Sequence, residues 1–124
     1  MDNLYITGDL VYIHGSLRII NNCDGYYVTY YDENESLQEV NVNVIEGIPL
    51  TPYILEKNGW KKSKINDCAY FYYKDGLFIT YTSKDGKFWF DDFDYSSSIC
   101  VYLHYVHSLQ QLLFGIGLNS EMEV

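Results

Sequence analysis

The sequence predicts an α+β protein. Short apolar runs separated by turn residues fill most of the chain, which is typical of strands in small antiparallel sheets. Two segments carry helix signals instead, one near residue 52 and one after residue 104. A chain of 124 residues can also bury a hydrophobic core without disulfides or a metal. We therefore expect an acidic β-barrel over residues 1–47. A helix, a four-stranded antiparallel sheet and a final helix should follow over residues 48–124.

The first part of the chain contains four strand signals. Turn residues such as His14-Gly15 and Asp24-Gly25 separate them, and this spacing favours a small barrel or sandwich. The expected strands are Leu10 to Ile13, Leu17 to Ile20, Tyr26 to Tyr31 and Leu37 to Val44. In the last of these strands, valine and asparagine alternate strictly from residue 40 to residue 44. That alternation predicts one buried and one solvent-facing side.

The segment PLTPYILEKNGW predicts a short helix. Thr51 suits the N-cap, and Pro52 suits the first helical position. Ile54 and Leu55 supply an apolar stripe, and Asn58-Gly59 supplies a left-handed end. The helix should have about two turns.

A strand meander and a last helix are expected to complete the chain. Two D-G steps join the predicted strands Ala69 to Tyr73, Leu77 to Thr82 and Phe88 to Asp91, which favours tight hairpins. A fourth strand, Ile99 to Leu103, follows the acidic loop from Asp91 to Ser98. The helix should begin near His104 and end at Gly115 and Gly117. Its predicted apolar face consists of Val106, Leu109, Leu113 and Ile116.

Charge is distributed unevenly along the chain. Residues 1–50 hold eight acidic residues against Arg18, whereas residues 51–124 hold nine acidic residues and seven lysines. Binding to DNA or RNA requires clustered Lys and Arg, so we expect no direct nucleic-acid binding by the acidic half. Carboxylates along its strands could instead imitate nucleic-acid phosphates. The 14 tyrosines suit either a protein interface or ordinary strands.

One mixed patch is a candidate ligand site. Lysines lie beside an indole in an otherwise acidic chain, and an anionic nucleotide needs both positive charge and a stacking ring. The set consists of Lys57, Trp60, Lys61, Lys62 and Lys64. The same residues also fit a solvated helix end, with lysines favouring the helix dipole and Trp60 packing under the helix.

The histidines near the C-terminus raise the question of a metal. On one continuous helix, Cys100, His104 and His107 would share a face and could bind zinc. We expect Cys100 on a strand instead, which removes that spacing, and we expect His107 to donate a hydrogen bond from the helix to the sheet. Asp91, Asp92 and Asp94 lack the glycine and distal glutamate of a calcium loop. We therefore expect no metal and no cofactor.

Catalysis and secretion also lack sequence signals. The chain has no phosphate-binding G-x-x-x-x-G-K loop and no G-x-S-x-G nucleophile motif, so we expect no enzymatic activity. Its three cysteines form no C-x-x-C pair, and no apolar run is long enough to span a membrane. These features predict reduced thiols, a cytoplasmic location and no membrane association.

The order of motifs resembles that of a known family. The segments TGDLVYIHGSLRII, EGIPLTPYILEKNGW and YVHSLQQLLFGIG are similar to motifs in small uncharacterised proteins of gut Bacteroidetes and their phages and prophages. Relatives carry a G-I-P-L-T centre and a Y-V-H-x-L-Q-N-L-Y-F-A-L-T-G end, from which this chain departs at Gln111-Leu112-Leu113 and at Gly115-Ile116-Gly117. The resemblance implies an SH3-like barrel followed by an α+β unit. It implies no activity.

Two functions are consistent with these observations. The first is a non-enzymatic, phage- or prophage-encoded interaction module that binds a host or phage protein through an acidic, Tyr-rich surface. The alternative is a phage anti-defence protein that sequesters a small anionic or nucleotide signal at the lysine and tryptophan patch.

Overall fold

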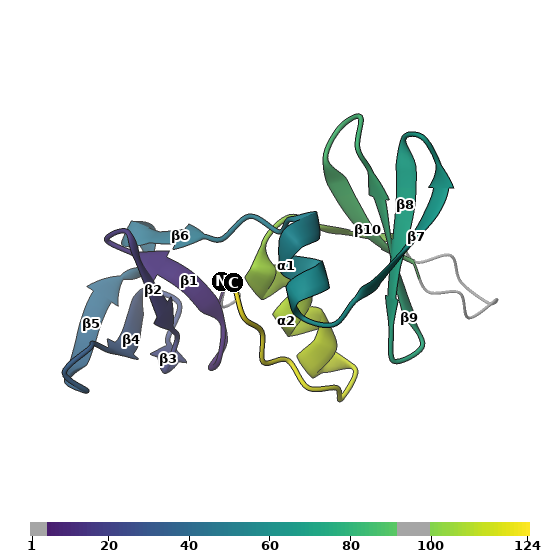
Figure 1. The fold of residues 1–124 in the computed structure, drawn as a ribbon. Helices are drawn as coiled ribbons and strands as arrows, with labels where there is room; N and C mark the ends of the chain where they lie inside the picture. The colour runs from purple at the N-terminus through teal and green to yellow at the C-terminus, as the bar shows by residue number, and fades with distance from the viewer. Residues whose placement is uncertain (1–4, 92–99) are drawn as a thin grey trace. The chain divides into compact units, whose positions relative to one another are not determined.

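The computed structural model describes residues 5–91 and 100–124, and its fold is α+β (Figure 1). These residues form two α-helices, a short 3-10 helix and open antiparallel sheets. The chain divides into two compact units. Unit 1 comprises residues 1–49 and 105–122, and unit 2 comprises residues 50–104 and 123–124. The first boundary lies close to the expected one, but the last helix belongs to the first unit and not to the second.

Unit 1 contains two three-stranded sheets. One has the order β2-β1-β6, with β1 at Leu10–Ile13, β2 at Ser16–Ile19 and β6 at Ile45–Gly47. The other has the order β3-β4-β5, with β3 at Asn22–Cys23, β4 at Tyr27–Tyr31 and β5 at Leu37–Asn41. Both sheets are open, and they contribute to one buried cluster that includes Val11, Ile13, Val28 and Tyr30.

The expected strand from Leu37 to Val44 is wrong at its end. Residues Val42–Val44 form a short 3-10 helix, η1, after β5. The side chain of Asn41 accepts a hydrogen bond from the backbone N–H of Asn43 at 2.9 Å. Asparagine readily makes such local bonds, which compete with sheet pairing. Alternation of valine and asparagine therefore did not suffice to continue the strand.

Helix α2, Val106–Gly115, completes unit 1. Its Val106, Leu109 and Leu113 are buried as expected, but Ile116 is exposed and Gln110 is buried in its place. The helix also begins two residues later than predicted. Tyr105 is extended and forms a β-bridge with Pro49, and the N–H of Val106 donates to Ile48 O at 2.8 Å. This pairing keeps the backbone out of the helix until Val106.

In its described part, unit 2 has a short helix and five strands. Helix α1, Pro52–Lys57, has the predicted Thr51 N-cap, whose hydroxyl accepts the N–H of Ile54 at 3.2 Å. The sheet order is β11-β10-β9-β8-β7, all antiparallel. The bounds are β7 Lys61–Asn66, β8 Ala69–Lys74, β9 Leu77–Thr82, β10 Lys87–Asp91 and β11 Cys100–Leu103. The predicted four-stranded sheet lacked β7, which is polar except for Ile65.

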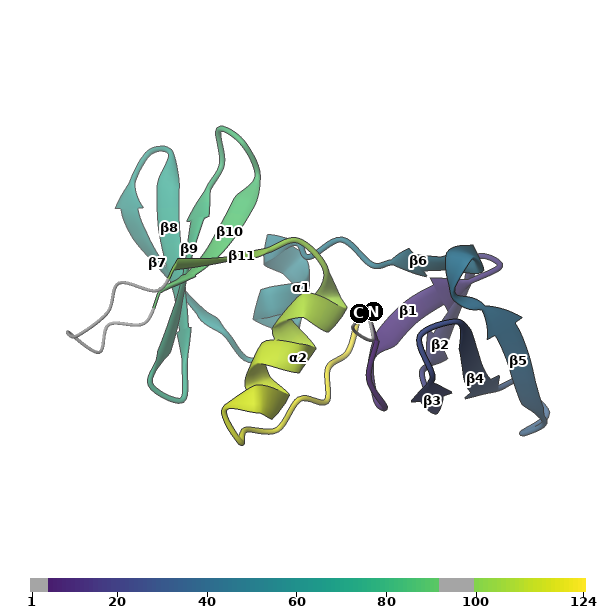
Figure 2. The same ribbon diagram turned by 180° about the vertical axis from the view of Figure 1, so that it is seen from behind.

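Strand alternation gives the sheet of unit 2 one buried face. Tyr72, Ile79, Phe88 and Phe90 lie in register on that face and are buried. Helix α1 runs alongside the sheet in both ribbon views (Figures 1 and 2). Burial, and to a lesser degree the carboxylate of Glu56 on α1, raises the pKa of Tyr72 to about 12. The buried face is therefore the one that α1 covers.

Candidate functional site

The predicted tryptophan and lysine patch is not assembled as a stacking site. Trp60 is only 4% exposed, and its backbone N–H donates to Leu55 O at 3.0 Å as the chain leaves α1. Lys57 is in the last turn of α1, where its Nζ donates to Val124 O at 3.0 Å and lies 6.0 Å from the Tyr53 ring centre. A buried indole cannot stack on a ligand base, so Trp60 has the packing role that was the other interpretation.

The other three lysines lie on the edge strand β7. Lys62 and Lys64 share one face, whereas Lys61 points to the opposite face. Lys62 Nζ lies 4.2 Å from the Tyr70 ring centre, and Lys64 pairs with Asp67 at 3.0 Å. Lysines on an edge strand discourage another strand from pairing there. The five residues thus divide between a helix end, the core and two faces of a strand.

The histidine and cysteine residues do not share a helix. Cys100 is on β11 as predicted, and His104 lies between β11 and α2, so the i, i+4, i+7 spacing is not realised. His104 Nδ1 is 2.9 Å from the Tyr102 hydroxyl. Across residues 5–91 and 100–124, no group of three or more His, Cys, Asp or Glu side chains is arranged to bind a metal. Asp92 and Asp94 lie outside the described residues.

His107 occupies an aromatic site inside unit 1. Its ring stacks on Tyr105 at a centre distance of 5.2 Å and tilts against Tyr5 at 5.0 Å. The expected hydrogen bond from the helix to the sheet is not formed at Nδ1, which is buried without a partner among the described residues. Burial lowers the pKa of His107 to about 4. The neutral ring is therefore the form that the fold accommodates.

Unit 1 should lose stability in mild acid because of His107. The unfolded chain takes up a proton at its ordinary pKa of 6.5, whereas the folded chain resists protonation down to about pH 4. Stability contributed by neutral His107 is thus present above pH 6.5 and is lost as the pH falls toward 4. Between pH 7 and pH 4.5, the free energy of unfolding of wild type should fall by about 1–2 kcal/mol more than that of His107→Phe. This value is smaller than the full pKa shift implies, because solvent screens a partly exposed ring. Urea denaturation measures both curves, and parallel pH profiles would contradict the assignment.

The outer face of β4 and β5 is an exposed, partly apolar surface of unit 1. Tyr27 and Tyr31 lie on the same side of β4, and the register places Leu37 directly opposite Tyr31. Tyr31 and Leu37 are each 55% exposed. Glu39 is opposite Thr29, between the two tyrosine positions. The face therefore presents two aromatic rings and a leucine around one carboxylate.

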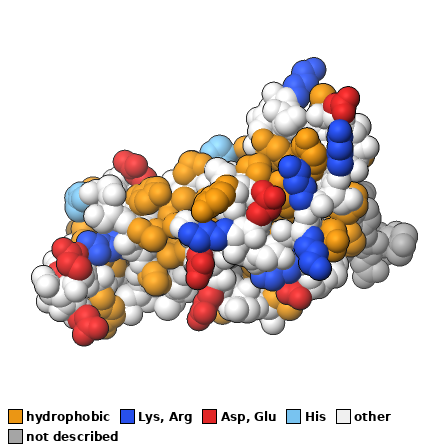
Figure 3. All heavy atoms as spheres, in the orientation of Figure 1, with side chains coloured by type: hydrophobic (Ala, Val, Ile, Leu, Met, Phe, Trp, Pro, Cys, Tyr) orange, Lys and Arg blue, Asp and Glu red, His pale blue; other side chains and the backbone are white. Residues whose placement is uncertain are grey.

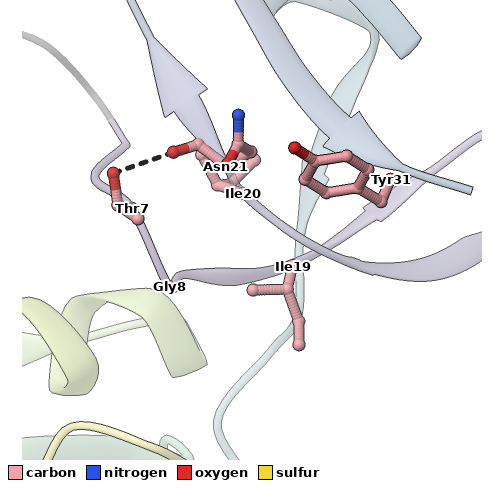
Figure 4. Close-up of a pocket in the computed structure, with 6 residues that line it drawn as sticks. All are labelled: Thr7, Gly8, Ile19, Ile20, Asn21 and Tyr31. Atoms are coloured by element: carbon pink, nitrogen blue, oxygen red, sulfur yellow. Dashed lines mark hydrogen bonds between the residues drawn. The ribbon is translucent and has the colours of Figure 1, made fainter. Parts of the chain in front are cut away.

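A pocket lies beside this face. Its volume is about 390 Å³, and it is lined by Thr7, Gly8, Ile19, Ile20, Asn21 and Tyr31 (Figure 4). The Thr7 hydroxyl donates to Asn21 O at 2.9 Å, which fixes the polar side of the pocket. Ile19 is 60% exposed and supplies apolar surface. Tyr31 belongs both to this pocket and to the outer face of β4, so one tyrosine joins the two features.

The division into units concentrates the negative charge. Unit 1 contains nine acidic residues and one basic residue, Arg18, a formal charge of −8. Unit 2 contains eight acidic residues and seven lysines, a formal charge of −1. Several acids of unit 1 also shape turns. The N–H groups of Tyr27 and Tyr26 bond to Asp24 and lower the pKa of its carboxyl group, so that it stays ionised at neutral pH.

Sequence reasoning missed a second surface, the outer face of the sheet in unit 2. It consists of Phe71, Tyr73, Phe78, Trp89 and Tyr102, none of which is buried. The sequence did contain a signal for this surface. In β8 and β10, consecutive residues are aromatic, as in YFYY and FWF, so each strand places aromatic side chains on both faces of the sheet. When one face of such a sheet is covered, every second aromatic side chain lies on the uncovered face.

No family model, curated protein or solved structure matches the chain. Within the described part of the chain, no helix is long and apolar enough to cross a membrane. The arrangement of side chains is therefore the basis for a functional proposal.

Proposed function

We propose that this protein is a non-enzymatic interaction module, encoded by a phage or prophage, in which unit 1 binds a basic host or phage protein. The family resemblance implies a small SH3-like barrel for this unit, and its two sheets, which are open, share one core. The observation that carries the proposal is the outer face of β4 and β5. Tyr27, Tyr31 and Leu37 surround Glu39 there, in a unit with a formal charge of −8.

The chemistry of this face indicates what it would bind. Tyrosine contributes a large contact area at little entropic cost and is enriched at interface hot spots. An exposed Glu39 among apolar side chains suits a Lys or Arg of the partner. The negative field of unit 1 would attract a positively charged protein and accelerate association. The partner is therefore a basic protein with an apolar contact area.

The proposal predicts salt-sensitive binding that depends on Tyr31. Retention of a partner from host lysate on immobilised protein should be strong at low salt and weaker at high salt, because salt screens exposed charges. Tyr31→Thr keeps strand propensity but removes the ring, and should weaken binding about tenfold or more. Calorimetry with the purified partner measures that change. Glu39→Lys should slow association further.

Matched controls test whether the β4–β5 face is responsible. Tyr53→Ala removes an even more exposed tyrosine from α1 in unit 2, and Glu46→Lys reverses an exposed charge on β6, in the other sheet of unit 1. Both variants should bind nearly as well as wild type. If no partner is retained at low salt, or if these controls lose as much binding as Tyr31→Thr, the proposal fails.

The alternative function, sequestration of an anionic or nucleotide signal, loses its stacking ring at the predicted site because Trp60 is buried. A different set of residues offers stacking rings and lysines together.

A further inference from the structure

The outer face of the sheet in unit 2 is an open aromatic surface. Phe71 and Tyr73 come from β8, Phe78 from β9, Trp89 from β10 and Tyr102 from β11. Strand alternation separates them from the buried face formed by Tyr72, Ile79 and Phe88. Exposed apolar areas of this kind on a soluble domain commonly mark binding sites.

The rings are ordered across neighbouring strands. One row of the register runs Ser63, Phe71, Thr80, Trp89, Tyr102, across all five strands. Trp89 and Tyr102 are 5.2 Å apart between ring centres, and Phe71 and Phe78 are 5.8 Å apart. Thr80 separates Phe71 from Trp89. The surface thus offers two groups of rings on either side of a small hydroxyl side chain.

Lysines supply the charge on this surface. Lys61 is opposite Tyr73, and Lys87 Nζ lies 5.7 Å from the Tyr102 ring centre. Among the strand positions whose side chains the structure describes on this face, none is acidic. In the space-filling view, Lys or Arg side chains lie near both hydrophobic and Asp or Glu side chains over the side of unit 2 that faces the viewer (Figure 3). The face therefore combines stacking rings with positive charge in a protein whose net charge is −9.

We infer that this face binds single-stranded nucleic acid by stacking unpaired bases on the aromatic rings, with Lys61 and Lys87 contacting the phosphates. Base-to-ring stacking tolerates any sequence because every base has a π-face, and lysines at the edge of a ring platform track the backbone. A second copy of the chain would bring like-charged lysines toward one another, and a neutral ligand would not need them. A single-stranded nucleic acid would use both the rings, which stack on its bases, and the lysines, which contact its phosphates.

The acidity of the rest of the chain limits the expected affinity. The negative charge of unit 1 would repel a nucleic-acid strand. On the outer face of the unit 2 sheet, only Lys61 and Lys87 would release counterions from the phosphates. We expect a dissociation constant of about 10⁻⁴ to 10⁻⁶ M at moderate salt. With two phosphates neutralised, the logarithm of the binding constant should fall with the logarithm of salt concentration with a slope of about −1.4.

Fluorescence anisotropy of fluorescein-labelled oligo(U) and oligo(dT) 12-mers tests this inference on the full chain. Both oligonucleotides should bind. A blunt-ended duplex of the same length should bind more weakly, because its bases are already paired and stacked on one another. Tyr102→Leu should weaken binding about tenfold, and Lys61→Gln should reduce the salt slope by about 0.7. Binding should also quench the fluorescence of Trp89, since Trp60 is buried.

Neighbouring residues supply the controls. Lys62→Gln removes the same charge one residue along β7 but on the opposite face, and should change the affinity less than Lys61→Gln. Tyr31→Thr, which tests unit 1, should leave oligonucleotide binding unchanged. No anisotropy change at 1 mM protein, or binding that Tyr102→Leu leaves intact, would overturn the inference. The inference would also be overturned if the protein binds no oligonucleotide but self-associates in sedimentation, and Tyr102→Leu abolishes that self-association.

Discussion

Leu109→Ala should lower the free energy of unfolding by about 2–5 kcal/mol. The Leu109 side chain is fully buried in unit 1, where α2 packs on β1. Alanine is a good helix former, so the loss reports removal of apolar contacts and not of helix propensity. His104→Ala should cost less than about 1 kcal/mol, because His104 is exposed and outside the helix. Urea denaturation at pH 7 measures both.

The order of these two effects distinguishes apolar packing from a structural metal. If His104 and His107 bound zinc, their loss would remove metal-binding energy that is also folding energy, and chelator would lower the melting temperature. We expect EDTA to leave the melting curve unchanged. Stoichiometric zinc in untagged protein by elemental analysis, with a chelator-dependent loss of stability, would contradict this expectation.

Local sequence was sufficient where a few adjacent residues decide the backbone. The N-cap of α1 depends on Thr51 and Pro52, and the predicted hairpin between β8 and β9 depends on Asp75-Gly76, both of which have positive φ. Such preferences are strong enough to act without the rest of the chain. The meander and the first helix were therefore predicted within one or two residues.

The errors arise where distant contacts override a local pattern. The strand β7 contains Lys61, Lys62 and Lys64 and no apolar alternation, and pairing with β8 alone makes it a strand. Helix α2 was assigned to the second part of the chain because it follows β11 in sequence. Its buried Gln110 shows why it belongs to unit 1. Gln110 Oε1 accepts the N–H of Leu10 at 2.7 Å, and Nε2 donates to Gly8 O at 3.1 Å.

The candidate surfaces were harder to predict than the strands that carry them. Phe71 and Trp89 read as ordinary strand residues until the register places them in one row with Tyr102. Conversely, Trp60 and the nearby lysines are adjacent in sequence but divide between the core and two faces. A ligand contacts a surface, and a surface is defined by pairing partners that are far apart in sequence.

Two segments that characterise the sequence, GIP at residues 47–49 and YVH at residues 105–107, pair with each other in unit 1. Val106 N–H donates to Ile48 O, and Pro49 forms a bridge with Tyr105. The ring of Tyr105 lies directly against the Cα of Gly47, where a Cβ would be 2.5 Å from Tyr105 Cδ1. The start of α2 is thus fixed against the end of β6 by backbone pairing and by the absence of a side chain at residue 47.

Gly47→Ala should therefore destabilise unit 1 by about 1–3 kcal/mol, the usual cost of forcing an extra methyl group into a packed site. No backbone strain contributes, because Gly47 does not have a positive φ. Gly115→Ala is the matched control. A Cβ at Gly115, at the end of α2, would have no neighbour within 4 Å, so alanine should be neutral or should stabilise by up to about 1 kcal/mol.

A double-mutant cycle shows whether the overlap with Tyr105 is the cause. Tyr105→Ala removes the ring, so the added methyl group of Gly47→Ala should cost little in that background, and the coupling energy should reach about 1 kcal/mol or more. Thermal and urea denaturation of the four proteins supply the values. If Gly47→Ala costs as much without the tyrosine ring as with it, contact with Tyr105 is not why glycine is needed at residue 47.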